Sequence, residues 1–513
     1  MSGQILTHTD LTAPFERSCD VAIIGSGAGG AVLAAGLAEA GLSVIMLEEG
    51  SHLTRTDFTL QERDAYPALY QESTTRSTAD QAISILQGRS VGGSTTINWT
   101  TCFRTPERIL DHWQRVHGIE GLDGDSLAPH FDAVEARLSI QTWPGPMANP
   151  NNAVLRDGCA ALGWEASPLR RNVRGCANSG YCGMGCPVDG KQAMGITYIQ
   201  DAVDAGMTLL ANVRADRIEE SGGRVVAIHG RVISPGASQP DGSAVVIRPR
   251  VTVSSAGAIN GPMLLLRSGI DSQGLVGRRT FLHPVIGMLG MFAHQINPYY
   301  GAPQSWGSHH LYDRGPDRVG MFFEAAPMHP SLAATALNLF GDDLRRGMQQ
   351  LPHSNVLLSL AVDGLHPDDD GGVVSLRSDG RLRLDYPVRP FLVEAMRVGH
   401  RALAEIQLAA GASVSRSLHN NPVELRSRAD LDALDAAPYG AHEHPIFTAH
   451  QMGGCAMGSD PSTSVVDAEH RHHRIPNLFV VDGSVLPTAL GVNPSETIYG
   501  LAHRARQFVG EAV

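Results

Sequence analysis

Apolar and polar positions near the N-terminus follow two different spacings. Residues 20–48 begin with an apolar run that ends at Ile24, continue through a glycine turn into an Ala- and Leu-rich stretch with helical spacing, stop at Gly41, and close with a second apolar run that ends at Glu48. This order is typical of a βαβ unit, in which two parallel strands flank one helix.

The rest of the chain predicts a mixture of helices and strands. Residues 301–387 have a mixed pattern that indicates no regular element. Helices are predicted within residues 106–137, 195–206 and 390–412, and strand signals occur at residues 208–218, 224–233 and 247–260. The interleaved order predicts an α/β fold.

Composition narrows the class of protein. The 513 residues are 42% hydrophobic and 18% charged, which fits a globular chain with several domain-sized units. The net charge of -12 and the lack of clustered Lys and Arg argue against binding to nucleic acid. We expect no transmembrane segment, and the polar first 20 residues with the absence of a disulfide-like cysteine pattern favour a cytoplasmic protein.

The glycine turn carries the first chemical signal. Gly25, Gly27 and Gly30 form G-x-G-x-x-G between a strand and a helix, so that backbone N–H groups can face a pyrophosphate. Glu48 follows about twenty residues later, where its carboxylate can bind ribose hydroxyls. A tight packing turn is the alternative explanation. The complete pattern predicts an adenine dinucleotide site, but this turn alone does not choose between NAD and FAD.

Three further blocks resemble the glucose–methanol–choline (GMC) oxidoreductase family. They are GRSVGGSTTIN at residues 88–98, AGAINGPMLLLRSGI at 256–270, and the C-terminal block that starts with HQMGGCAMG at 450–458 and continues over 477–505. The second block departs from the family pattern at Gly261 and Asp271. The C-terminal block is the most specific of the three.

The resemblance implies FAD as the cofactor and a discontinuous Rossmann-like FAD-binding domain. This domain would comprise residues 1–110, 190–290 and 445–513. A second, substrate-binding domain, built on a β-sheet and helices, would comprise residues 111–189 and 291–444. The residues expected to contact the cofactor are Gly25, Gly27, Gly30, Glu48, Gly92, Gly93, Ser94, Asn98, Val213, Asp482 and Pro494.

The resemblance also implies that His450 and Asn493 lie at the reacting carbon of an alcohol. A neutral imidazole can accept the hydroxyl proton near neutral pH, so His450 is the expected base. Asn493 is expected to donate its amide N–H to the substrate oxygen while a hydride moves to flavin N5. The local sequence is nearest to cholesterol-oxidase and long-chain-alcohol-oxidising members, which favours a bulky or apolar alcohol. The electron acceptor stays open between oxygen, a quinone and another carrier.

A cysteine-rich loop presents a competing site. Cys176, Cys182 and Cys186 lie in a glycine-rich segment, and thiolates in such a loop can bind iron–sulfur clusters. Their spacing matches no standard run, and Cys159 is the only nearby candidate for a fourth ligand. We expect no metal and a structural loop near the substrate entrance.

Two other functions remain open on the same motifs, beside an NAD(P) dehydrogenase, for which the C-terminal block would be unexplained. One is an FAD-containing enzyme resembling a hydroxynitrile lyase, in which His450 and Asn493 would act as acid and base only. The other is a flavin-binding protein without catalytic activity, because a fold alone never establishes an activity.

Overall fold

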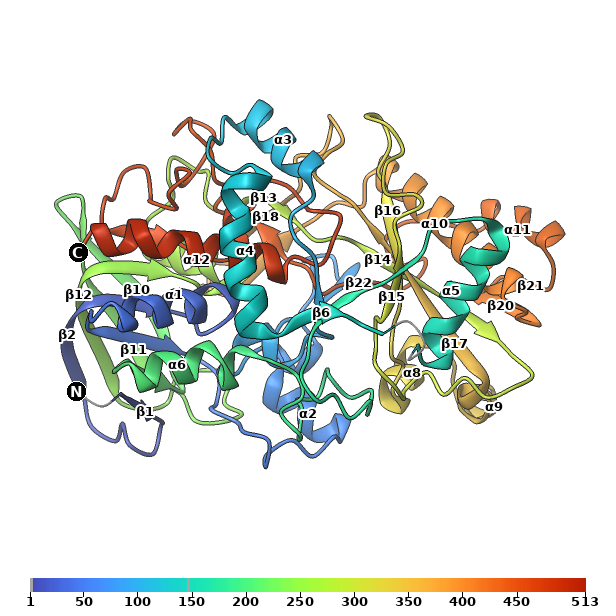
Figure 1. Ribbon diagram of the computed structural model, residues 1–513, viewed down its shortest axis with the longest axis horizontal. Coiled ribbons are helices and arrows are strands. Elements are labelled where there is room, and N and C mark those ends of the chain that lie inside the picture. The colour runs from blue at the N-terminus through green and yellow to red at the C-terminus, as the bar shows by residue number, and fades with distance from the viewer. Residues whose placement is uncertain (1–2, 145–147) are drawn as a thin grey trace.

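The computed structural model describes residues 3–144 and 148–513. The described residues leave out residues 1–2, which belong to the predicted FAD-binding part, and residues 145–147, which belong to the predicted substrate-binding part. The chain forms two large sheets, one toward each end of the long axis, with both termini beside the first sheet (Figure 1).

The first sheet has the order β1-β9-β3-β2-β12-β11-β10, and β24 also pairs with β12. All pairings among the first five strands and that of β24 are parallel, whereas β10, β11 and β12 run antiparallel. Its strands are β1 (Gln4–Leu6), β2 (Phe15–Ile24), β3 (Val44–Glu48), β9 (Thr208–Ala211), β10 (Val213–Ser221), β11 (Arg224–Val232), β12 (Ala244–Ser254) and β24 (Leu478–Val480).

Helices cover this sheet because its central strands are apolar on both faces. β3 is buried at every position, as parallel strands between two layers are. Helix α1 (Ala28–Glu39) packs against α6 (Tyr198–Asp204) and α12 (Ser495–Glu511), and α12 also packs against α4 (Gly124–Leu138). Figure 1 shows α1, α6 and α12 stacked over the sheet. The predicted βαβ unit is confirmed.

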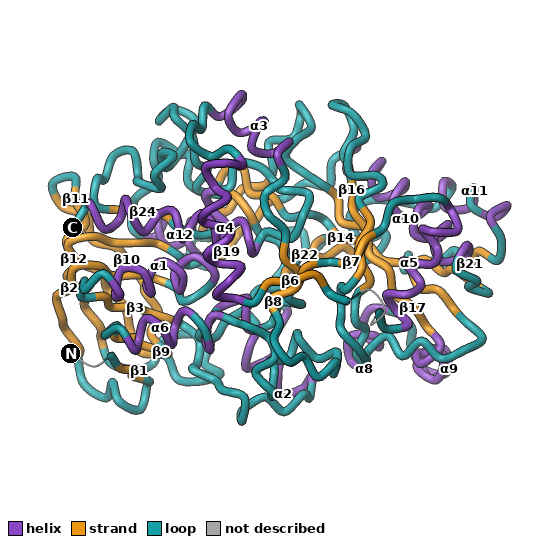
Figure 2. Tube along the Cα trace, viewed as in Figure 1, coloured by secondary structure: helices purple, strands orange, loops and turns teal. Residues whose placement is uncertain are grey.

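The second sheet has the order β21-β20-β14-β17-β16-β15-β7, extended by β22 and β4. Figure 2 shows these strands in orange beyond the loops that separate the two sheets. The strands are β4 (Ile83–Ile85), β7 (Ser167–Pro168), β14 (Val285–Met291), β15 (Trp306–Ser308), β16 (Met321–Ala325), β17 (Ser354–Ala361), β20 (Val414–Ser417), β21 (Glu424–Leu425) and β22 (Ile446–Thr448). The predicted long helix is α10 (Pro390–Ala409), which packs on this sheet together with α5 (Pro150–Leu162).

Smaller elements complete the fold. Two small sheets contain β13 (Arg278–Phe281), β18 (Gly372–Leu376), β19 (Leu382–Asp385) and β23 (Met452–Gly453), and β5 (Thr101–Cys102), β6 (Ile140–Thr142) and β8 (Arg170–Asn172). The remaining helices are α2 (Glu62–Leu69), α3 (Glu107–His117), α7 (Gly257–Arg267), α8 (Pro330–Ala336), α9 (Gly341–Gln350) and α11 (Asp432–Asp435).

The strands of the two sheets can be compared with the predicted division of the chain into two parts, although they do not test that division as domains. All strands of the first sheet fall in the segments assigned to the FAD-binding part. β4 and β22, together with most of β14, fall in those segments as well but pair within the second sheet. Among the described residues, no helix is both long and apolar enough to cross a membrane.

Candidate active site

A cavity of about 760 Å³ runs between the two sheets. Side chains and backbone of both sheets line it, so segments that are far apart in the sequence share one wall. The residues expected at the cofactor or the reacting carbon that line it are Gly25, Gly27, Glu48, Gly93, Ser94, Asn98, Val213, His450, Asp482, Asn493 and Pro494. Gly30 and Gly92 do not line it.

The glycine turn forms one end of the cavity. Gly25 has a positive φ of 102°, and a Cβ there would lie 2.3 Å from the carbonyl oxygen of Ser255, so that a larger residue is excluded. Gly27 caps the N-terminus of α1. The free N–H groups and positive dipole of a helix N-terminus favour a negatively charged group. Gly30 packs under this turn instead of facing the cavity.

Glu48 ends β3 beside the turn and is buried. One of its oxygens, Oε2, accepts hydrogen bonds from the backbone N–H and the hydroxyl of Ser26 at 3.0 and 2.6 Å, and the other accepts from the Gly50 N–H at 2.7 Å. Burial raises the pKa of Glu48, and these donors oppose that shift. The carboxyl therefore ties the glycine turn to the strand end and also faces the cavity.

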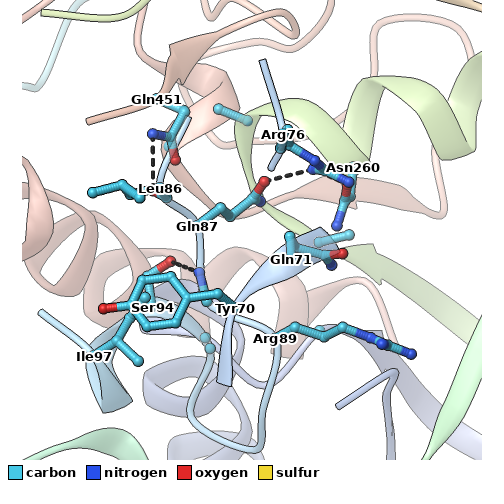
Figure 3. A pocket seen from close by; sticks show the side chains of 18 of the residues that line it. Tyr70, Gln71, Arg76, Leu86, Gln87, Arg89, Ser94, Ile97, Asn260 and Gln451 are labelled. Atoms are coloured by element: carbon cyan, nitrogen blue, oxygen red, sulfur yellow. Dashed lines mark hydrogen bonds between the residues drawn. The ribbon is translucent and has the colours of Figure 1, made fainter. Parts of the chain in front are cut away.

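Asp482, which passes close to Gly29 at the start of α1, binds the backbone in a similar way. Its Oδ2 accepts from the Gly257 N–H at 2.7 Å, at the start of α7, and its Oδ1 accepts from the Ser484 N–H at 2.8 Å. Nearby, Ser94 accepts a hydrogen bond from the Gly88 N–H, and Arg76 donates to Gln87 and Asn260 at 2.7 and 2.9 Å (Figure 3). This wall is polar.

His450 and Asn493 meet at the other end of the cavity. Asn493 Nδ2 lies 3.3 Å from His450 Nε2. The backbone N–H of His450 donates to the Thr448 hydroxyl at 3.0 Å, which fixes the residue to the end of β22. Burial lowers the pKa of His450 to about 4, so the imidazole is neutral at pH 7.

Sequence reasoning missed His283, a buried imidazole that contacts His450. The two Nδ1 atoms are 3.1 Å apart, and the rings meet edge to face at 77°. His283 Nε2 accepts the backbone N–H of Gly491 at 2.9 Å, and the His283 backbone N–H donates to Asp363 at 3.0 Å. Burial, with a smaller effect of His450, holds the pKa of His283 well below its usual range.

A second missed group is the buried pair Gln304 and Glu324. Gln304 lines the cavity, and its Nε2 donates to Glu324 Oε2 at 2.5 Å. Glu324 lies in the otherwise apolar strand β16. A single acidic residue within an apolar run was the sequence signal that could have identified Glu324, because burying a carboxyl without a function costs free energy.

Apolar side chains of the second sheet face the cavity. They pack in one cluster with Phe322, whose ring contacts His283 edge to face. The apolar residues that line the cavity from this cluster are Trp99, Val285, Leu358, Leu360 and Phe447.

The cysteine loop lies against the loop that contains Asn98. The buried Lys191 ammonium donates to the carbonyl oxygens of Thr96, Asn98 and Cys182. Burial raises the pKa of the Cys182 thiol and lowers that of Lys191 to about 8. Within residues 3–144 and 148–513, no group of three or more His, Cys, Asp or Glu side chains could hold a metal ion.

Comparison with known proteins identifies the relationships of the chain. The model of the GMC oxidoreductase family matches residues 66–285 with its N-terminal part and residues 367–502 with its C-terminal part, and an NAD(P)-binding Rossmann-like domain matches residues 23–64.

Among curated relatives, an uncharacterized GMC-type oxidoreductase of Mycobacterium tuberculosis is 30% identical over 96% of this chain and 75% of its own length. A long-chain-alcohol oxidase of Arabidopsis thaliana is 30% identical over 94% of this chain and 66% of the relative. Pyridoxine 4-oxidase from Mesorbium loti has a similar fold, with a TM-score of 0.71 and 21% identity over 96% of this chain and 99% of that one.

Replacing Glu48 tests the dinucleotide end of the cavity. Glu48→Ala removes an acceptor of charge-assisted hydrogen bonds, and we expect dinucleotide binding to weaken by about 1.5–3 kcal/mol. Titration of the apoprotein, followed by fluorescence, measures the effect. Glu39→Ala, at the exposed end of α1, is the control. Unchanged affinity in Glu48→Ala would remove Glu48 from the site.

Metal analysis tests the cysteine loop. We expect purified protein to contain no stoichiometric iron or zinc, because the three thiols lack a fourth ligand and Lys191 already binds the loop. Inductively coupled plasma mass spectrometry gives the metal content per chain. Iron near one or more per chain would contradict the structural interpretation of the loop.

Proposed function

We propose that this chain, which belongs to the GMC oxidoreductase family, oxidises the CH–OH group of an alcohol to a carbonyl. FAD is the cofactor of this enzyme. The observation that carries the proposal is the approach of His450 Nε2 and Asn493 Nδ2 to 3.3 Å on the cavity wall.

The residues present fit FAD. Gly25, Gly27 and the N-terminus of α1 would hold the diphosphate, and Glu48 would face the adenosine ribose. Asp482 and Pro494 also line the cavity and would contact the rest of the cofactor. Asn98 Oδ1 is a buried oxygen that finds no donor within the described part of the chain, and a bound cofactor could supply one. When bound, FAD accepts the hydride.

In this proposal, His450 and Asn493 have different roles toward the alcohol. His450 Nε2 removes the hydroxyl proton, so that the two electrons of the C–H bond can leave with the hydride. Asn493 Nδ2 donates to the oxygen and stabilises the negative charge that develops there. The neutral state of His450 supports this role, because an imidazolium could not accept a proton.

The apolar wall favours an apolar alcohol. Val285, Leu358 and Phe447 would contact a hydrocarbon chain or ring while the oxygen lies at His450. The relatives that are long-chain-alcohol oxidases support this substrate class, and we propose it for this chain. We also propose a cytoplasmic location, on the composition alone.

A spectrum and an alcohol panel test the function. Purified protein should be yellow, release FAD on denaturation, and bleach when an apolar primary alcohol is added without oxygen. An enzyme of the hydroxynitrile-lyase type would keep its flavin oxidised under these conditions. A protein that reduces no dye with any alcohol of the panel would contradict an oxidoreductase. Oxygen and artificial dyes, used in parallel, distinguish an oxidase from a dehydrogenase.

His450→Gln tests the proposed base. Glutamine keeps a hydrogen-bonding group but cannot accept a proton near neutral pH. We expect FAD to remain bound and the rate of flavin reduction to fall by about two to four orders of magnitude. Anaerobic rapid mixing with a saturating alcohol measures this rate. Reduction at the wild-type rate would show that His450 is not the base.

Asn493→Ala tests the proposed donor. We expect flavin reduction to slow by about two to three orders of magnitude, because the developing alkoxide loses one hydrogen bond. The double variant His450→Gln with Asn493→Ala should fall well short of the summed losses, since both groups act on one transition state. Fully additive losses would contradict a shared site.

A further inference from the structure

The chain contains a single lysine, and it is buried behind one wall of the cavity. Lys191 is the only lysine in the sequence and is 3% exposed. Its ammonium group donates to the carbonyl oxygens of Thr96, Asn98 and Cys182. A compact ammonium can direct three donors to three converging oxygens, which the planar fork of a guanidinium cannot do. All other basic residues apart from histidine are arginines, so this position alone uses an ammonium.

A second buried cation binds the same segment and the same loop. Arg171 in β8 is fully buried, and its Nη2 lies 3.4 Å from the carbonyl oxygen of Trp99 and 3.9 Å from Cys182 Sγ. Its Nε and Nη1 find no acceptor among the described residues. Within residues 3–144 and 148–513, neither Arg171 nor Lys191 hydrogen-bonds to a carboxylate. Two buried positive charges thus lack a fixed negative charge, which costs free energy.

Both cations hold the backbone of a segment that lines the cavity. Ile97, Asn98 and Trp99 belong to the cavity wall, and Figure 3 shows Ile97 there. Because a trans peptide unit places C=O and N–H on opposite sides, the N–H groups that follow the bound carbonyls point away from the cations. The next residue, Thr100, has a φ of 71°, a left-handed conformation that a β-branched residue rarely adopts. Such a backbone persists only where its surroundings fix it.

The missing negative charge has two possible sources beside this segment. One is the Cys182 thiol. Burial raises its pKa, although Arg171 and Lys191 act in the opposite direction, and the thiol is therefore protonated at pH 7. The other source is the cofactor. A hydride brings two electrons and one proton, so FAD becomes more negative by one charge when it accepts a hydride.

We propose that Lys191 and Arg171 are positioning residues for hydride transfer: they fix residues 96–99 beside FAD and supply the positive charge that offsets the charge FAD gains. This inference rests on the proposed function, in which Asn98 contacts the cofactor. In an interior of low dielectric, charges that do not touch still interact by several kcal/mol or less, depending on distance. The two cations should therefore increase the affinity of bound FAD for electrons.

Lys191 makes this effect dependent on pH, because an ammonium can lose its charge and a guanidinium cannot. Burial lowers the pKa of Lys191 to about 8; the Cys182 and Cys186 thiols oppose that shift, and Arg171 adds to it. No other titratable group of the described chain contributes. The ammonium is thus charged at pH 7 and loses its proton as the pH rises through about 8. Because coupling between two sites is reciprocal, reduction of FAD must raise the pKa of Lys191.

The single lysine allows its charge to be measured directly. Protein that contains ¹³C-labelled lysine gives one ε-carbon signal in a nuclear magnetic resonance spectrum, and the position of this signal follows the ionisation of Nζ. In the FAD-bound enzyme without alcohol, we expect a midpoint near pH 8 with oxidised FAD. After reduction with dithionite, the midpoint should lie about one pH unit or more higher. Equal midpoints in the two states would overturn the inference.

Lys191→Met removes the charge and keeps a side chain of similar length. At pH 7 we expect the equilibrium constant for reduction of bound FAD to fall about ten- to a hundredfold, which lowers the midpoint potential by about 30–60 mV. Titration against redox dyes measures this potential. Cys182→Ala, in the same loop, is the matched control and should keep the constant within about twofold. An unchanged potential in Lys191→Met, or a raised potential in Cys182→Ala, would refute the role of the two cations.

The dependence on pH separates charge from a purely structural role. The difference between the wild type and Lys191→Met should shrink as the pH rises from about 8 to about 10, because Lys191 then becomes neutral in the wild type as well. A constant difference would contradict the inference. If Lys191→Met fails to fold or to bind FAD, the titration of the wild-type lysine decides. Both measurements use no alcohol, so they keep their outcome even if His450→Gln reduces its flavin at the wild-type rate and the proposed base fails.

Discussion

The close approach of α1 to the ends of the sheet strands is the constraint on which the rest of the site depends. A Cβ at Gly25 would lie 2.3 Å from the Ser255 carbonyl oxygen, and one at Gly29 would lie 1.8 Å from that of Val481. Glycine alone allows these contacts. They bring the N-terminus of α1 against the residues that follow β12 and β24, so that Glu48 and Asp482 line the same cavity. The end of the cavity proposed for the cofactor is thus built from backbone and two buried carboxyls.

The end of the cavity at His450 and Asn493 differs in its electrostatics, because its polar groups are buried without opposite charges. His450 and His283 are neutral, and burial raises the pKa of Glu324 to about 8. In a medium of low dielectric, the energy of each group depends on which neighbour donates and which accepts. Asn493 places Nδ2 at 3.3 Å from His450 Nε2, and its buried Oδ1 finds no donor among the described residues. Proton positions, more than fixed charges, therefore decide what this end of the cavity offers to a substrate.

Local signals in the sequence were sufficient for the elements with a local pattern. The βαβ unit around the Gly25–Gly30 turn and the long helix α10 of the second sheet depend on neighbours within a few turns of chain, and each was predicted. Glu324, Gln304 and His283 were not, since they reach the site through the register of β14 to β17, in and beside the stretch whose pattern indicated no element. The short strands β4 and β22 were missed for the same reason: three residues carry no pattern, and their pairing with each other and with β14 exists only in the folded chain.

Strand β22 connects the apolar wall of the cavity with the buried polar groups at His450. Phe447 pairs with Val285 of β14 and lines the apolar wall, whereas Thr448, the next residue, holds the backbone of His450. Because successive residues of a strand point to opposite faces, one short strand can place an apolar contact and a polar anchor side by side. A substitution on β14 or β17 that reshapes the apolar wall therefore acts next to His450 without touching the glycine turn. The apolar wall can vary while the glycine turn stays fixed.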